Sequence, residues 1–83
     1  MDHIARTTKD LGQALRAARK AKGLTQAELA ARGGVWQRTV SNIETGASGA
    51  KVDTIFDLLA ALDLELQIVP RSKMTPRDLE DIF

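Results

Sequence analysis

Apolar residues recur along most of this chain at the three- and four-residue spacing of amphipathic helices. Four such stripes are separated by glycine-containing breaks, near residues 22–23, 33–34 and 45–50. Their apolar positions are Leu11, Ala14, Leu15 and Ala18; Leu29 and Ala30; Val35, Val40 and Ile43; and Val52, Ile55, Phe56, Leu59 and Leu62. The pattern predicts four helices whose apolar faces meet in one core.

Polar residues mark where two of these helices begin. Thr25 followed by Glu28 is a capping box, in which each side chain accepts a hydrogen bond from a backbone N–H at a helix start. A helix is therefore expected from Gln26, and the two glycines at residues 33–34 end it. Thr7 with Asp10 resembles a second capping box and predicts the start of the first helix.

The period changes from helical to two after the fourth stripe. Leu64, Leu66 and Ile68 alternate with polar residues, and Pro70 ends the run. This is the pattern of a strand with one apolar face. A single strand in a helical chain leaves backbone groups and that face without a partner, so we expect it to pair with the same strand of a second copy.

The last 13 residues, 71–83, open with a basic stretch and end in the apolar pair Ile82 and Phe83. Thr75 and Pro76 could begin a short helix, but so short a helix is unstable alone in water. Two interpretations stay open. The tail is a frayed end, or it orders on a partner protein with Ile82 and Phe83 as the contacts.

Composition limits the class of protein. A chain of 83 residues forms one small domain, for which oligomerisation is an expected source of stability. It has no cysteine and a single histidine, His3, near the terminus, so we expect no metal site and no cofactor. The absence of a long apolar run predicts a soluble cytoplasmic protein that does not enter a membrane.

Charge is divided unevenly between the two parts of the chain. Residues 1–51 carry a net charge of +5 and residues 52–83 a net charge of −4, which together give the total of +1. A basic region can meet a polyanion, whereas the acidic region suits a different neighbour. The two short helices and tight turn of residues 25–46 lie in the basic part, and this layout is typical of a helix-turn-helix DNA reader.

The motif T-Q-x-E-L-A, then G-V-x-Q, then S-N-I-E-x-G resembles the Xre-type helix-turn-helix family of phage and plasmid repressors. The resemblance covers roughly residues 8–62. One departure is Trp36, which stands where small or polar residues are common in the family. Arg19 and Glu44 resemble the family's arginine–glutamate pair, which ties the first helix to the end of the reading helix.

This resemblance implies two sets of DNA contacts. Glutamine can pair with adenine and arginine with guanine through two hydrogen bonds, and serine can add a contact on the same face. The expected base-reading residues are Gln37, Arg38 and Ser41. The expected backbone contacts are Thr25, Gln26, Thr39 and Asn42.

Beyond the helices the chain is similar to the HipB-like antitoxins of bacterial type II toxin–antitoxin pairs. That resemblance implies a homodimer joined by an intermolecular two-stranded sheet, a palindromic double-stranded operator, and a HipA-like Ser/Thr kinase toxin as partner. The expected fold is mainly α, a four- to five-helix domain like that of lambda repressor, with one C-terminal strand pairing across the dimer. It divides into an arm (1–6), a DNA-binding domain (7–63), a dimerisation strand (64–70) and a tail (71–83).

Three other functions are alternatives to an antitoxin that also represses its own transcription. A stand-alone dimeric repressor of phage or plasmid type would use the strand for dimerisation alone. A purely structural dimerisation module would not require the polar face of residues 37–42. An enzyme would need groups for acid–base or nucleophilic work, and the sequence offers no recognisable set of them.

Overall fold

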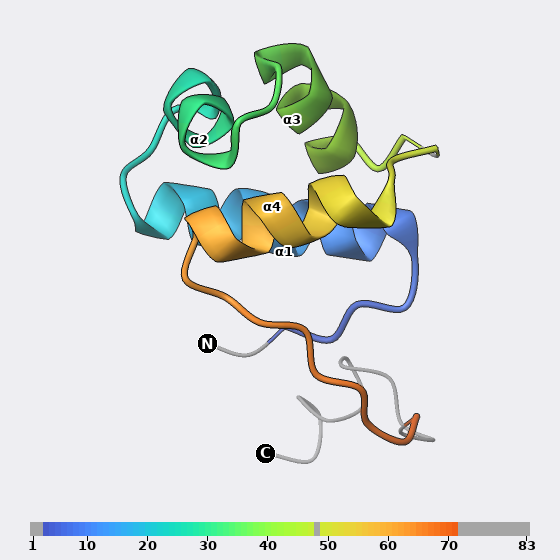
Figure 1. Cartoon of the computed structure of the whole chain (residues 1–83). Helices are drawn as coiled ribbons and strands as arrows, with labels where there is room; N and C mark the ends of the chain where they lie inside the picture. Colours follow the sequence, from blue (N-terminus) through green and yellow to red (C-terminus); the bar gives the residue numbers. More distant parts are fainter. Residues whose placement is uncertain (1–2, 48, 72–83) are drawn as a thin grey trace.

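The computed structural model describes residues 3–47 and 49–71, and this part of the chain contains four α-helices. They are α1 (Thr8–Ala21), α2 (Gln26–Gly33), α3 (Gln37–Glu44) and α4 (Val52–Ala61). Figure 1 shows α2 and α3 together on one side of the molecule, above α1 and α4 in the view. α3 packs against both α1 and α2, while α4 packs against α2. The four predicted helices are therefore confirmed.

The core takes side chains from every helix. Its buried members are Leu15, Leu24, Leu29, Ala30, Val40, Ile43, Leu58, Leu59 and Leu62. The predicted inward faces of α2 and α3 are confirmed, and Val35 packs against the core from the turn between them. The buried side chains of α3 hold it against α1 and α2, and its other face is open to solvent.

The predicted apolar face of α4 is wrong at two positions. Val52 and Phe56 are 67% and 48% exposed, whereas Leu58, which was not predicted in the core, is 1% exposed. Leu58 packs against Gly33 of α2. A Cβ atom added to Gly33 would lie 3.1 Å from the Cδ2 atom of Leu58. Gly33 thus leaves room for Leu58. With Leu58 on the inner side of α4, Val52 and Phe56 face solvent.

The predicted N-terminal caps are formed. In α2 the Glu28 N–H donates to Thr25 Oγ1 at 3.1 Å, and the Thr25 N–H donates to Glu28 Oε1 at 3.0 Å. In α1 the Asp10 N–H donates to Thr7 Oγ1 at 3.0 Å, but the Asp10 carboxylate accepts from the Arg6 N–H instead of from Thr7. Both helices therefore begin where the sequence predicts.

Gly12 allows α1 and α3 to cross at very short range. A Cβ atom built on Gly12 would meet the Ile43 carbonyl oxygen at 2.1 Å and the Glu44 carbonyl oxygen at 3.0 Å. Any side chain there would push the end of α3 away from α1. A glycine inside a helical pattern usually weakens the helix, so its presence here indicates a packing requirement.

Residues 64–71 form a segment that continues from α4 without regular secondary structure. The turn into it uses Asp63 in the left-handed conformation (φ 57°), with the Leu64 N–H donating to the Leu59 carbonyl at 2.8 Å. Figure 1 shows the segment on the side of α1 and α4 that faces away from α2 and α3. Leu64, Leu66 and Ile68 are 43%, 54% and 91% exposed.

The strand expected over residues 64–70 is not formed within one chain. A β-ladder needs a neighbouring strand, and the described residues of a single chain contain no strand. The helical part of the predicted fold class is confirmed, and pairing across a dimer stays a prediction. The tail contacts Ile82 and Phe83 lie outside the described residues. Within the described ranges, no helix combines the length and apolar character that crossing a membrane requires.

Candidate nucleic-acid interface

α2, a tight turn and α3 form the helix-turn-helix unit. Gly34 has a left-handed backbone (φ 69°), and the Val35 N–H donates to the Ala30 carbonyl at 3.0 Å, which closes the end of α2. Val35 then packs against the core, and Trp36 precedes the first residue of α3. The turn therefore sets the angle between the two helices from within the chain.

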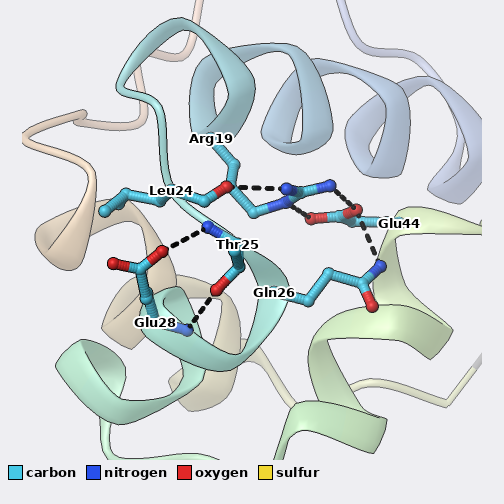
Figure 2. A network of polar contacts seen from close by, with 6 residues as sticks. All are labelled: Arg19, Leu24, Thr25, Gln26, Glu28 and Glu44. Atoms are coloured by element: carbon cyan, nitrogen blue, oxygen red, sulfur yellow. Dashed lines mark hydrogen bonds and ion pairs between the residues drawn. The ribbon is translucent and has the colours of Figure 1, made fainter.

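A buried ion pair joins α1 to the end of α3 (Figure 2). Arg19 Nε donates to Glu44 Oε2 at 2.7 Å, and Arg19 Nη2 donates to Glu44 Oε1 at 3.0 Å. The two residues are 8% and 6% exposed. Arg19 Nη1 also donates to the Leu24 carbonyl at 2.8 Å, so the same guanidinium holds the loop between α1 and α2. The predicted pair is present with bidentate geometry.

The pair is charged and its polar atoms are satisfied. Hydrogen bonding to Glu44 raises the pKa of Arg19 above its usual range. Burial alone would raise the pKa of Glu44, but hydrogen bonds from Arg19 and Gln26 outweigh it and lower that pKa below its ordinary value. In residues 3–47 and 49–71, every buried side-chain nitrogen and oxygen has a hydrogen-bond partner. An ion pair of this kind orients the reading helix, even where its net stabilisation is small.

Gln26 belongs to this network, which the sequence did not predict. Its Nε2 atom donates to Glu44 Oε1 at 3.1 Å (Figure 2). The bond uses one of the two hydrogens of the side-chain amide. The second hydrogen, and the backbone N–H at the first position of α2, are the groups with which Gln26 could hold a phosphate.

The three predicted base-reading residues lie on the side of α3 that is not buried in the core. Gln37 and Arg38 are exposed in its first turn, and Ser41 is half-buried one turn later. The opposite side of the helix is formed by Val40 and Ile43, which are buried in the core. The helix thus presents its polar face outwards while its apolar face anchors it.

Two of the predicted contacts to the DNA backbone lie beside Lys51, a basic residue for which the sequence predicted no role. Thr39 and Asn42 line an open hollow together with Lys51 and Thr54, at the start of α4. Lys51 is exposed and directly precedes α4. Its signal in the sequence is a lone lysine that follows a small-residue loop.

A second hollow lies along α1 and was also missed. Lys9, Gln13 and Arg16 line it together with Gln26 and the end of α3. These three α1 residues are exposed and follow one another at four- and three-residue steps, so they share one helical face. This spacing is visible in the sequence, but no DNA contact was predicted on the first helix.

A capped first helix, a glycine turn, and a second helix that is buried on one side and polar on the other define a helix-turn-helix DNA-binding domain. The helix-turn-helix family profile matches residues 15–69. The chain therefore belongs to the Xre-type helix-turn-helix family of DNA-binding transcriptional regulators, whose members are not enzymes.

Two curated proteins illustrate the range of its relatives. The chain is 39% identical over 71 residues to the uncharacterized HTH-type transcriptional regulator y4dL of Sinorhizobium fredii, but spans 36% of that protein's length. It is 31% identical over 70 residues to antitoxin HipB of Escherichia coli, and the match covers 84% of this chain and 80% of HipB. The chain is thus HipB-like along most of both sequences.

Solved structures give the same grouping. A chain of the HipA-HipB-O2-O3 complex superposes with a TM-score of 0.78 at 28% identity, covering 86% of this chain and 100% of that one. The restriction-modification controller protein C.AhdI of Aeromonas hydrophila gives a TM-score of 0.67 at 38% identity, covering 70% of this chain and 88% of that one. The shared feature of these relatives is the helical DNA-binding domain.

Proposed function

We propose that this protein is a cytoplasmic antitoxin that also represses its own transcription. It binds a palindromic operator as a homodimer and neutralises a HipA-like Ser/Thr kinase toxin. The observation that carries the proposal is the polar face of Gln37, Arg38 and Ser41, held in place by the buried Arg19–Glu44 pair. Similarity to HipB over 84% of the chain supports the antitoxin role.

DNA recognition is divided between base and backbone contacts. Arg38 supplies two donors for guanine, Gln37 pairs with adenine, and Ser41 adds a contact one turn later. Thr25, Gln26, Thr39 and Asn42 contact the phosphate backbone. Lys51, Lys9 and Arg16 line the two hollows beside these residues and supply positive charge to the same contacts.

A homodimer gives the segment of residues 64–70 a partner. Leu64, Leu66 and Ile68 are exposed in one chain, and an antiparallel pair with a second copy would satisfy backbone groups along one edge of each strand and bring these side chains into cross-strand contact. Such a dimer presents two copies of α3. They should lie about 34–36 Å apart, one turn of DNA, so that the operator is an inverted repeat.

The toxin is proposed to meet the acidic part of the chain. Asp53, Asp57, Asp63 and Glu65 are exposed on α4 and the segment after it. In Figure 1 the segment after α4 lies on the opposite side of the molecule from α3, so DNA and a partner protein bound to that segment need not compete. Ile82 and Phe83 are the proposed anchors in the tail, because a few buried apolar side chains usually carry most of an interface's energy.

Selection of binding sites from a random duplex library tests the reading face. Arg38→Ala and Gln37→Ala should each cost roughly 1–3 kcal/mol and relax the preference at particular base pairs. Gln26→Ala should weaken all sequences more evenly, because phosphate contacts carry no sequence information. The assignment is wrong if the Arg38 and Gln37 variants keep the wild-type preference.

Co-purification from the native host tests the antitoxin role. A kinase-like protein should be retained by the full chain and released when residues 75–83 are deleted, while dimerisation and DNA binding persist. Unchanged capture of the kinase by the truncated chain would show that the tail is not the anchor.

A stand-alone repressor of phage or plasmid type is the second candidate. The observation in its favour is the 38% identity to a restriction-modification controller protein over 70% of this chain, which exceeds the 31% identity to HipB. A neighbouring reading frame for a kinase-like protein favours the antitoxin. Its absence, together with no kinase in the co-purification, favours the stand-alone repressor.

A further inference from the structure

Trp36 stands at the entry to the reading helix with its side chain almost entirely in solvent. It is 83% exposed, and as the N-cap of α3 it makes no side-chain capping bond. Its backbone is held, since its carbonyl accepts from the Thr39 N–H at 3.0 Å and from the Val40 N–H at 3.3 Å. A large apolar ring is therefore displayed at a defined point without contributing to the core or to the cap.

We propose that Trp36 is a specificity-determining DNA contact that packs against a thymine methyl group in each half-site. The inference rests on the proposed DNA-binding function. When a helix-turn-helix docks, the first residues of its second helix contact base edges in the major groove. Trp36 directly precedes Gln37 and Arg38 on the chain, so the same docking brings the indole to the groove.

The chemistry of the indole selects the kind of contact. Indole has one N–H donor and no acceptor, so it cannot read a base through the paired hydrogen bonds available to glutamine or arginine. It offers a wide apolar surface. The thymine C5-methyl is an apolar group on the major-groove face of a base pair, and apolar side chains recognise it. Trp36 would thus add a thymine preference beside the positions read by Gln37 and Arg38.

Fluorescence tests the contact directly. The chain has one tryptophan and no tyrosine, so its emission reports on Trp36. The probe is the duplex that the protein enriches from a random library, with binding followed independently by the anisotropy of a dye on the DNA. The emission of Trp36 should change in parallel with anisotropy. Unchanged emission at saturating anisotropy would overturn the inference and leave DNA binding itself intact.

Replacing each thymine of that duplex in turn by deoxyuridine, which lacks the methyl group, tests base readout. At one thymine per half-site, the wild-type protein should bind about fourfold more weakly, the value expected for one buried methyl group. Trp36→Ala should lose this dependence on the methyl group. Trp36→Phe, which keeps a flat apolar ring, should retain most of it.

The remaining outcomes separate this inference from the proposed function. If every deoxyuridine duplex binds as tightly as the original, Trp36 does not read thymine and the inference is wrong. If no duplex is bound at all by anisotropy, the DNA-binding proposal fails and this inference fails with it. The unfolding temperature of Trp36→Ala should match that of the wild type because the side chain is exposed, and a large drop would contradict the structural premise.

Discussion

Arg19 and Glu44 are 8% and 6% exposed, bonded to each other, and tied to Leu24 and Gln26 as well. Leu66 and Ile68, by contrast, are apolar residues that are 54% and 91% exposed in a single chain. The first region is polar and buried with its groups satisfied. The second is apolar and uncovered. This reverses the usual distribution of polar and apolar groups in both places.

The contrast indicates which parts of the function one chain can provide. The helix-turn-helix unit has its turn, the Thr25 cap of α2 and its orienting ion pair within residues 8–45. The segment of residues 64–70 has the sequence pattern of a strand but needs a second strand beside it. A reading helix can therefore be built by one chain, whereas the spacing between two reading helices depends on two.

Breaking the ion pair should have the largest effect on the stability of one chain. Arg19→Met should lower the free energy of unfolding by about 3–5 kcal/mol, because it leaves Glu44 buried without its partner. The matched control is Lys22→Met, since Lys22 Nζ lies 3.7 Å from Asp63 Oδ2 in an exposed pair. That change should cost less than about 1 kcal/mol. Urea unfolding measures both values, and equal losses of unfolding free energy in Arg19→Met and Lys22→Met would contradict the account.

The crossing of α1 and α3 gives the next largest effect. Gly12→Ala should destabilise by about 3 kcal/mol, because its Cβ would lie 2.1 Å from the Ile43 carbonyl oxygen. In an unobstructed helix the same substitution would stabilise by about 1 kcal/mol. Gly34→Ala is the control. It meets no atom within 4 Å but has φ 69°, so backbone strain alone should cost about 1–2 kcal/mol.

Acidic pH should remove part of the contribution that Glu44 makes to the free energy of unfolding. The pKa of Glu44 is lower in the folded protein than the ordinary value of about 4.3 expected when unfolded. Its contribution is complete above that ordinary value and is lost as the pH falls through the folded pKa. The stability advantage of the wild type over Glu44→Gln should therefore narrow below about pH 4. The prediction is contradicted if the difference in unfolding free energy between the wild type and Glu44→Gln stays constant from pH 6 to the most acidic condition that preserves folding.

Leu66→Asp should have the smallest effect on the folding of one chain and a decisive effect on assembly. Leu66 is 54% exposed, so a polar replacement should change monomer stability by less than about 0.5 kcal/mol. Light scattering at high micromolar concentration should give a dimer for the wild type and a monomer for the variant. A monomeric wild type would remove the proposed role of residues 64–69.

Local features of the fold were predictable from the sequence because they depend on neighbours along the chain. The caps at Thr7 and Thr25 follow from side-chain chemistry within a few positions. The Arg19–Glu44 pair joins residues 25 positions apart, and it was anticipated through resemblance to a family and not through spacing.

Features that depend on how helices cross were missed. Periodicity places Val52 and Phe56 on an apolar stripe, but it does not show which side of α4 will meet α2, and Leu58 takes that side. The close approach at Gly12 likewise belongs to the crossing of two helices. The bond from Gln26 to Glu44 links two helices and has no local signal.

The central claim is that one chain forms the complete reading face, whereas the spacing between two half-sites requires a second copy. Selection of binding sites from a random DNA library tests this claim most directly. The wild type should enrich an inverted repeat whose half-sites lie one turn apart, about 10 base pairs centre to centre. Leu66→Asp should enrich the same half-site singly. Enrichment of a single asymmetric site by the wild type, or of the full inverted repeat by Leu66→Asp, would contradict the account.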